Sequence, residues 1–541
     1  MYFTKHMNHQ LVGVNRLQMQ MSSLEDCITK DNAVRLVEAF VEKLNLKELG
    51  VLMEGKNNTI KGGRPSYTPA IFLKLYLYGY LNKIRSSRKL EQECHRNVEL
   101  HWLLQYLTPS YHTIADFRKN NAKALTSLFR LYVSFMDELK LLGKETIAID
   151  GTKLRAVNSS KNNYNQKKID KHQQLIAEKA ATYLTEMDML DKAEEKDLAQ
   201  QYRKEEVEAG LQALNSRIIK YDELEQRLQQ SEDKQISTTD IDSRAIIINK
   251  NIVEVAYNTQ CAVDAKHNLI VHCEATNTND GKALHQAAAQ AKENLQLQKE
   301  DTLTVLADKG YHTGAELQQC QQDYMRTYVA YKEQPAVKHI AREFLAESFA
   351  YHQASDSYTC PAGGVLTSLG TWHNKKGEAN ETSYRFKTYR TEACKTCVLK
   401  DQCTKLPRRI IHRSEYQDAV DINDNNIKNN PGYYKRRQAI CEHPFGTIKR
   451  GWGYSFTLLK GLAKVDGEMN LIMLCYNIKR TINILGFDSL LKAINNWHPN
   501  YKRVLCAIKM LVYKCIVKLN KHLQFLIKEN VRFLQVRVLS S

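Results

Sequence analysis

The stretch VLADKGYHTGAEL, residues 305–317, decides the fold. Its first three residues form a short apolar strand, Asp308 ends that strand, and a helical segment follows the turn at Gly310. A charged side chain in this position lies on the rim of a sheet, where α/β folds hold their chemistry. Because an aspartate at a strand end also commonly caps a helix, the interpretation depends on further carboxylates in similar settings.

Two other acids stand in such settings. Asp150 follows an apolar strand in TIAIDGTKLRA (146–156), and Glu442 is the single acid of the basic, aromatic stretch YYKRRQAICEHPFGTIKR (433–450). Proteins bind Mg²⁺ through one or two carboxylates together with substrate phosphate oxygens. Two such ions can clamp the attacking and the leaving oxygen of a phosphodiester. The three acids therefore predict a divalent-metal site that acts on phosphates.

The same stretches resemble the acidic triad of DDE transposases from bacterial insertion sequences. The run Tyr434, Arg437, Glu442 and Lys449 is similar to the Tyr-Arg-Glu-Lys signature of that group, with four residues instead of three between Arg437 and Glu442. The resemblance covers most of residues 20–485. It includes the segments RPSYTPAIFLKLYLYGYL (64–81), YHTIADFRKNN (111–121) and FTLLKGLAKVDGEMNLIMLCYNIKR (456–480).

The resemblance implies a metal-dependent enzyme that cuts DNA and transfers its strands. Asp150 and Asp308 would share one Mg²⁺ or Mn²⁺, and Asp150 and Glu442 the other. The expected partners are the terminal inverted repeats of the element, target DNA, and further copies of the chain in a homodimer or larger synaptic complex, at the nucleoid in the bacterial cytoplasm. The residues expected at the DNA are Lys153, Arg155, Lys309, Tyr434, Lys435, Arg436, Arg437, Lys449 and Arg450.

Two other function classes stay open on the sequence alone. The chain could be a DNA-binding regulator derived from a transposase and lacking catalysis, or an RNase H-like nuclease that cuts RNA–DNA hybrids. The formal net charge of +18 over 541 residues favours a polyanionic partner in every case, most simply a nucleic acid.

The composition also bears on the compartment. The cysteines number 13, which is an odd count, and they are scattered along the chain. The N-terminal segment has no long apolar core of the kind found in a signal peptide. We therefore expect a cytosolic protein whose cysteines are reduced. The longest apolar candidate, Val504–Leu526, is interrupted by four lysines, so no membrane span is expected.

Residues 1–140 predict an all-helical domain. Thr68 and Pro69 have the pattern of an N-cap and a first helical residue, and another helix begins near Ser87. Thr113 and Asp116 have capping-box spacing, with Asp in place of the usual Glu, and predict the start of a third helix that runs through Phe117, Leu125, Leu128 and Tyr132. Basic residues between these helices suit DNA binding, with a plain helical bundle as the alternative.

Residues 141–335 predict the first part of an RNase H-like core, a mixed sheet flanked by helices. Strands are expected at 145–155, within 254–276, up to Asp308 and at 328–332, with a helix around 282–295. The charged segment 165–235 carries heptad stripes and predicts a helical hairpin inserted after the first strand.

Four further aspartates compete for a role in the site. Asp280 precedes a helix, and we interpret it as an N-cap, with a metal ligand as the alternative. Asp264 is interpreted as a turn residue, and Asp240 and Asp242 as loop or cap residues.

Residues 336–430 predict a small Cys-rich insertion. Cys360, Cys394, Cys397 and Cys403 form a set that suits one tetrahedral structural Zn²⁺, with free thiols as the alternative. His373 or His412 could replace one of the cysteines.

Residues 431–485 predict the helix with the third acid. Pro444 either bends that helix or lies near its start, and Lys449 is expected near Glu442 in both cases. The aromatic residues Trp452, Tyr454 and Phe456 suit either core packing or stacking on bases. Residues 486–541 form a basic tail whose role the sequence leaves open.

Overall fold

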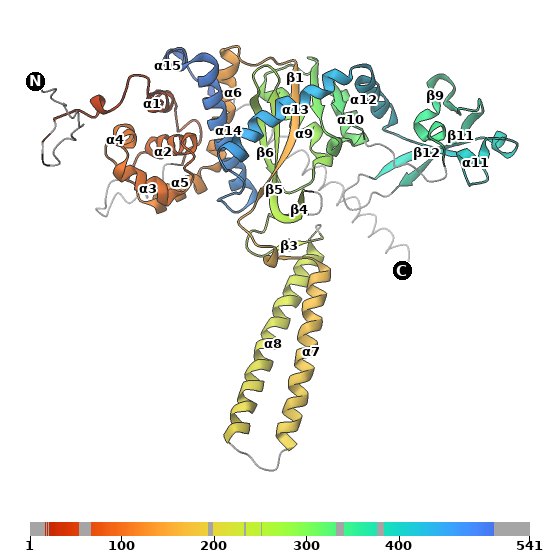
Figure 1. The fold of residues 1–541 in the computed structure, drawn as a ribbon, viewed down its shortest axis with the longest axis horizontal. Helices are drawn as coiled ribbons and strands as arrows, with labels where there is room; N and C mark the ends of the chain where they lie inside the picture. The colour runs from red at the N-terminus through yellow and green to blue at the C-terminus, as the bar shows by residue number, and fades with distance from the viewer. Residues whose placement is uncertain are drawn as a thin grey trace, which may run out of the picture. The chain divides into compact units, whose positions relative to one another are not determined.

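The computed structural model describes residues 17, 19, 21–52, 66–192, 198–231, 234–249, 252–331, 340–375 and 383–501 (Figure 1). Residues 56–65, whose polar, Gly-containing sequence predicts a linker, lie outside the described residues, as does the basic tail beyond residue 501. The chain divides into two compact units. The first comprises Met1–Leu46, Met53–Phe117 and Ile482–His498, and the second comprises Lys47–Leu52, Arg118–Thr481 and Pro499–Ser541.

The first unit is all-helical. Its α-helices are α1 (Val34–Glu42), α2 (Pro69–Leu81), α3 (Ser87–Arg96), α4 (Val98–Leu104), α5 (Tyr111–Asn120) and α15 (Phe487–Asn496). Its core contains a stack of aromatic rings. Phe117 stacks on Phe72, with 5.3 Å between the two ring centroids, and also on Tyr76. The predicted starts of α2 at Pro69, with Thr68 as N-cap, and of α3 at Ser87 are confirmed.

The capping box predicted at Thr113 and Asp116 is wrong. Helix α5 already begins at Tyr111, and the Thr113 hydroxyl lies 3.0 Å from that of Ser110. The chain then breaks at Asn121, and α6 (Ala122–Glu138) is a separate helix. The apolar spacing continues across this break, so the pattern alone suggested a single helix.

The second unit is built on a six-stranded mixed sheet with the order β4-β5-β1-β7-β8, in which β6 also pairs with β5. The central strand β1 pairs antiparallel with β5 and parallel with β7, and β7 pairs parallel with β8. This is the RNase H-like sheet that the sequence predicted. The strands are β1 (Thr146–Arg155), β4 (Arg244–Asn249), β5 (Ile252–Asp264), β6 (Leu269–Thr276), β7 (Leu303–Ala307) and β8 (Met325–Val329).

Helices pack along this sheet (Figure 1). Helix α9 (Leu284–Asn294) contacts β1, β5, β6 and β7, while α13 (Pro431–Phe445) contacts β1, β5 and β7. Helices α10 (Gly314–Gln322) and α12 (Gln417–Asn429) pack at β8. Trp452 and Tyr454, which follow α13, are buried in the core, whereas Phe456 is 45% exposed.

The predicted helical hairpin is confirmed as α7 (Gln166–Lys192) and α8 (Leu198–Gln230), the long pair of helices in Figure 1. Its heptad stripes pack against each other in a cluster that includes Ile176, Leu214 and Tyr221. The short strands β2 (Asn163–Tyr164) and β3 (Ile236–Ser237) pair at its base.

The Cys-rich insertion has its own five-stranded sheet, in the order β13-β12-β11-β10-β9. Tyr358, Leu366, Tyr389 and Ile411 form its buried centre. The elements are β9 (Ala350–His352), β10 (Ser357–Thr359), β11 (Val365–Lys375), β12 (Tyr384–Arg390), the short helix α11 (Lys400–Cys403) and β13 (Ile410–Ser414).

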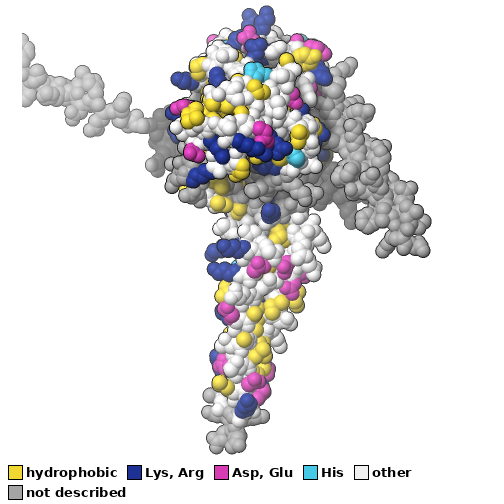
Figure 2. Space-filling model, turned by 90° about the vertical axis from the view of Figure 1, so that its right-hand side faces the viewer, with side chains coloured by type: hydrophobic (Ala, Val, Ile, Leu, Met, Phe, Trp, Pro, Cys, Tyr) yellow, Lys and Arg dark blue, Asp and Glu magenta, His cyan; other side chains and the backbone are white. Residues whose placement is uncertain are grey.

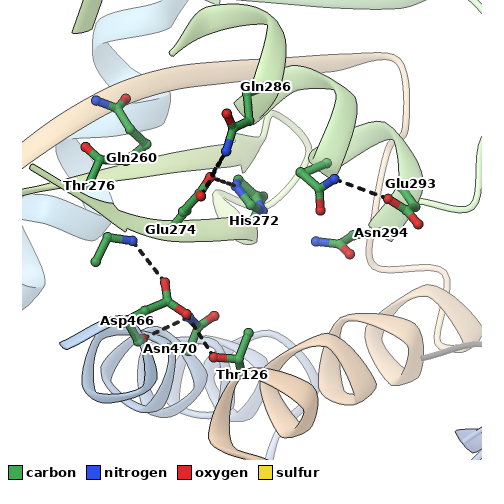
Figure 3. A network of polar contacts seen from close by, with 12 residues as sticks. Thr126, Gln260, His272, Glu274, Thr276, Gln286, Glu293, Asn294, Asp466 and Asn470 are labelled. Atoms are coloured by element: carbon green, nitrogen blue, oxygen red, sulfur yellow. Dashed lines mark hydrogen bonds and ion pairs between the residues drawn. The ribbon is translucent and has the colours of Figure 1, made fainter. Parts of the chain in front are cut away.

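A buried polar network joins β6 to α6 and α14 (Leu462–Leu485) (Figure 3). The Asp466 carboxylate accepts hydrogen bonds from the Ala275 amide at 2.9 Å and from the Thr126 hydroxyl at 3.0 Å. Gln286 donates to both oxygens of Glu274. Burial raises the pKa of Asp466, so these bonds compensate a carboxylate that is costly to bury.

Of the helices described, none is long and apolar enough to cross a membrane.

Candidate active site

Asp150 and Asp308 lie side by side because their strands are parallel neighbours. Ile149 on β1 pairs with Ala307 on β7, so the next residue of each strand is an aspartate at the same level of the sheet. Burial raises the pKa of Asp150 to about 6, the Arg437 guanidinium lowers it, and the charge of Asp308 raises it again. The two predicted carboxylates are therefore close enough to repel each other.

Backbone amides fix one oxygen of each aspartate. The Gly151 amide donates to Asp150 Oδ1 at 2.9 Å. The Gly310 amide donates to Asp308 Oδ1 at 2.8 Å, because Asp308 caps the short 3-10 helix Lys309–Tyr311. Asp308 Oδ2 accepts no hydrogen bond from any residue that the structure describes, so it is available to a ligand.

Helix α13 supplies the cation that faces Asp150. Arg437 Nη1 lies 3.3 Å from Asp150 Oδ2, and Cys441, one turn later, is fully buried on the same side of the helix. Burial lowers the pKa of Lys449, and the charge of Asp150 opposes this effect. Lys449 Nζ donates to the Lys153 carbonyl oxygen at 3.0 Å, so its head is held at β1.

Glu442 lies on the same helix but not on the side that holds Arg437. Its side chain is exposed, and its Oε1 accepts a hydrogen bond from Gln438 at 2.7 Å. Among the described residues, neither Glu442 nor its partner Gln438 makes a hydrogen bond to Asp150 or Asp308. The site geometry therefore contains two of the three predicted acids, with the third beside it on α13.

Pro444 lies inside α13, which continues past it into a π-helical turn, Gly446–Gly451. Of the two arrangements that the sequence allowed, the structure thus has the continuing helix, with Glu442 near its C-terminal end. A π-turn takes more residues per turn than an α-helix and changes the direction in which the following side chains point. This places Lys449 at β1 rather than in a bond with Glu442.

The other residues expected at DNA differ in their exposure and contacts. Arg155 pairs with Glu254 on the neighbouring strand β5. Arg436 lies over the ring of Tyr433, with its guanidinium carbon 5.0 Å from the ring centroid. The exposed members of the set are Arg155, Lys309, Lys435, Arg436 and Arg450, and the half-buried ones are Lys153, Tyr434, Arg437 and Lys449.

A polar network behind the two aspartates was not predicted from the sequence. Asp280 Oδ1 accepts hydrogen bonds from Asn258 at 2.7 Å and from Gln260 at 2.8 Å. The Tyr311 hydroxyl in turn donates to Gln260 Oε1. The N-cap interpretation of Asp280 is wrong, because Asn279 occupies the N-cap position and the Asp280 carboxylate turns to the sheet. The polar residues at alternate positions of the buried strand β5 were the available signal.

Asn258 has an unusual arrangement within this network. Both hydrogens of its amide are donated, one to the Thr278 carbonyl and one to Asp280, and its buried Oδ1 has no partner among the described residues. A Cβ added at Gly151 would lie 2.6 Å from Asp280 Oδ1 and 2.9 Å from Asn258 Oδ1. The network therefore packs directly against the residue that follows Asp150, and only glycine fits there.

The aspartate pair fits a divalent cation that takes its remaining ligands from a substrate. In the described residues, no group of three or more His, Cys, Asp or Glu side chains is arranged to hold a metal ion. Mg²⁺ needs no such cage, since one or two carboxylates plus phosphate oxygens and waters complete its coordination. Burial and the charge of Asp308 raise the pKa of Asp150, and a bound cation would lower it again.

The four cysteines predicted as zinc ligands border the same cavity of the Cys-rich insertion, but among the described residues they are not arranged as a metal-binding group. Cys360, Cys394, Cys397 and Cys403 all line one cavity of about 30 Å³. The Gly364 amide donates to Cys360 Sγ at 3.1 Å. His373 and His412 do not line this cavity. Both lie against Phe386 on another part of the insertion.

Comparisons with protein families match two parts of the chain. Residues 22–120 match the family described as "Transposase domain (DUF772)", and residues 359–482 match the family described as "Transposase DDE domain". The second match contains Arg437, Glu442 and Lys449. No curated protein and no solved structure matches the chain.

Proposed function

Because this chain belongs to the DDE transposases of insertion sequences, we propose that it binds the terminal repeats of its own element and moves that element by cutting and rejoining DNA. The observation that carries the proposal is the pairing of Ile149 with Ala307, which places Asp150 beside Asp308 next to the cation Arg437. A carboxylate pair flanked by cations suits a phosphodiester, whose charge must be neutralised before it can be attacked.

The reaction proceeds in two steps of the same kind. Water first attacks the phosphorus at the end of the element, and the 3′-oxygen leaves with a proton as a free hydroxyl. That hydroxyl then attacks a phosphodiester of the target, so one ester bond replaces another. Asp150, Asp308 and Glu442 would hold the divalent cations, which would supply activation of the attacking oxygen and stabilisation of the leaving one.

The residues of the chain have separate tasks in this proposal. Arg437 holds Asp150 Oδ2, and the amides of Gly151 and Gly310 hold one oxygen of each aspartate in place. Glu442 would be the third acid, and a cation bound there would replace its hydrogen bond with Gln438. The exposed cations around the site neutralise DNA phosphates, a contribution that weakens as salt rises.

The Cys-rich insertion holds one structural Zn²⁺ in this proposal. Thiolates are soft ligands that select zinc, whereas the carboxylates of the active site suit Mg²⁺ or Mn²⁺. The supporting observation is the shared cavity of Cys360, Cys394, Cys397 and Cys403, with an amide already donating to one sulfur.

Two copies of the chain hold the two ends of the element together in this proposal, and the hairpin α7–α8 is a candidate contact between them. Its outer surface exposes large apolar side chains, among them Leu184, Met189 and Tyr202. Light scattering with and without end DNA measures the assembly, and a monomer in both states contradicts it.

A nicking assay tests the proposed activity. Purified protein is incubated with Mg²⁺ and a duplex that carries the ends of the element. Asp308→Ala is expected to abolish nicking and to leave binding of the ends nearly intact. Asp301→Ala, at an exposed turn of the same unit, serves as the matched control and should nick normally. Full nicking by the Asp308 variant would refute the catalytic assignment.

Glu442 requires its own comparison. Glu442→Gln should abolish nicking, whereas Gln438→Ala removes only its partner and should retain it. End binding without nicking by the wild-type chain would identify a DNA-binding regulator instead. Cleavage of an RNA–DNA hybrid but not of duplex DNA would identify an RNase H-like nuclease.

A further inference from the structure

The sheet of the Cys-rich insertion carries a row of rings on one of its faces. His373 on β11 pairs across the strands with Phe386 on β12, and their ring centroids lie 5.6 Å apart. Phe386 also lies 4.6 Å from the ring of His412 on β13. The three side chains thus form a continuous aromatic row across three neighbouring strands, which we call the ring row.

The ring row lies on the face opposite the core of the insertion. Successive side chains of a strand point to opposite faces. Tyr389 on β12 and its cross-strand partner Ile411 are buried in the core, so Phe386 and His412 point the other way. The rings of His373 and His412 are exposed and Phe386 is half-buried, so the row is accessible to a ligand.

The charge around the ring row favours a polyanion. Lys375 follows His373 at the next position of that face and lies 5.5 Å from the ring of Tyr384. Arg390 extends the same face of β12 and is exposed. The described strands β11, β12 and β13 contain no Asp or Glu. Figure 2 shows Lys and Arg side chains on the face of the molecule toward the viewer, with Asp and Glu side chains among them.

The electronic state of the His412 ring favours stacking. Burial, followed by the charge of Lys375, lowers the pKa of His412, which favours its neutral ring. Neutral aromatic rings on a sheet bind unpaired bases by stacking, while cations beside them track the backbone. Bases inside a duplex are covered by their neighbours and offer no free face to such a row.

We propose that the ring row of His373, Phe386 and His412 binds unpaired bases of a single DNA strand. The inference rests on the proposed function, since a transposase frees strand ends that lose their pairing near the cut. It adds a second DNA-contacting surface to the chain, and it gives the two histidines a role other than zinc ligation.

Fluorescence polarisation tests the inference on the full-length chain in EDTA, where no cutting occurs. The probes are a labelled oligothymidine of about 20 nucleotides, which spans more than one typical single-strand site, and a duplex of the same length. Phe386→Ala removes the central ring and should weaken single-strand binding about ten-fold, with duplex binding changed less than about two-fold. The matched control is Trp372→Ala, which removes an exposed ring from the opposite face of the same strand pair.

A second measurement does not depend on a variant. Photocrosslinking of the wild-type chain to an oligonucleotide that carries 5-iododeoxyuridine should join peptides from β11, β12 or β13. Single-strand affinity unchanged in the Phe386 variant, equal losses in both variants, or crosslinks confined to other segments would overturn the inference.

These outcomes are separate from the test of the proposed function. Normal nicking of element ends with no crosslink at the ring row rejects this inference alone. Absence of all binding to DNA by the wild-type chain rejects the proposed function as well.

Discussion

The contact between α6 and α14 predicts a large local effect of one methyl group. A Cβ added at Gly467 would lie 2.5 Å from Cα, 2.6 Å from Cβ and 2.7 Å from the carbonyl oxygen of Ala122. Two of these atoms belong to the backbone, so no change of rotamer relieves the clash. Gly467→Ala therefore moves the two helices apart by about 1 Å, the shortfall from ordinary van der Waals contact.

The magnitude follows from three contributions. Overpacking of a core costs about 1–3 kcal/mol, and the better helix propensity of alanine returns about 1 kcal/mol. The separation also stretches the hydrogen bond between Thr126 and Asp466, now 3.0 Å long, which contributes about 1 kcal/mol. The free energy of opening of α14 should therefore fall by about 2 kcal/mol, which corresponds to roughly 30-fold faster amide exchange.

Hydrogen–deuterium exchange of peptides from α14 measures this effect. Gly432→Ala is the matched control, because it is also a helical glycine and no described atom lies within 4 Å of its added Cβ. It should leave exchange unchanged or slow it slightly. Equal exchange of α14 in the Gly467 variant and the wild type would refute the reasoning from close packing.

Three further predictions concern the sites. Gly151→Ala pushes its Cβ to 2.6 Å from Asp280 Oδ1, so nicking should fall about 100-fold while circular dichroism stays unchanged. In EDTA, the pKa of Asp150 is raised to about 6 by burial, so the folded state binds this proton more tightly than the unfolded state. Stability should fall as the pH rises from about 4 to about 6 and then level off, and thermal scans of Asp150→Asn should lack this contribution. Metal analysis should find one Zn²⁺ per chain, and Cys394→Ser should lose it together with several degrees of thermal stability.

The sequence predicted the sheet well because its strands are apolar runs with clear ends. The strand before Asp308 and the strand with Asp150 were found from their local pattern, and parallel pairing then brought the two acids together. Strand β4 was not predicted, since its pairing with β5 decides its conformation more than its own short pattern does. The break at Asn121 was missed for a similar reason, because the apolar period runs on through it.

The site was harder to predict where it depends on tertiary contacts. Asp280 lies 20 and 22 residues from its partners Gln260 and Asn258, and no local pattern shows that these side chains meet. For Glu442, the spacing along α13 fixed which residues share a side of the helix but not which side faces the sheet. Packing turned Arg437 and Cys441 toward Asp150, and this left Glu442 exposed.

The long interval between neighbouring strands has a consequence for synthesis on the ribosome. β1 ends about 150 residues before its parallel partner β7 begins, so at roughly 5–20 residues per second it waits roughly 8–30 s for that partner. The hairpin α7–α8 needs only local contacts and can form during this wait. Helix α13 emerges later still, and it alone brings Arg437 to Asp150. A nascent chain that stops before residue 431 therefore carries paired aspartates without the Arg437 side chain, and translation itself sets when this face of the sheet is complete.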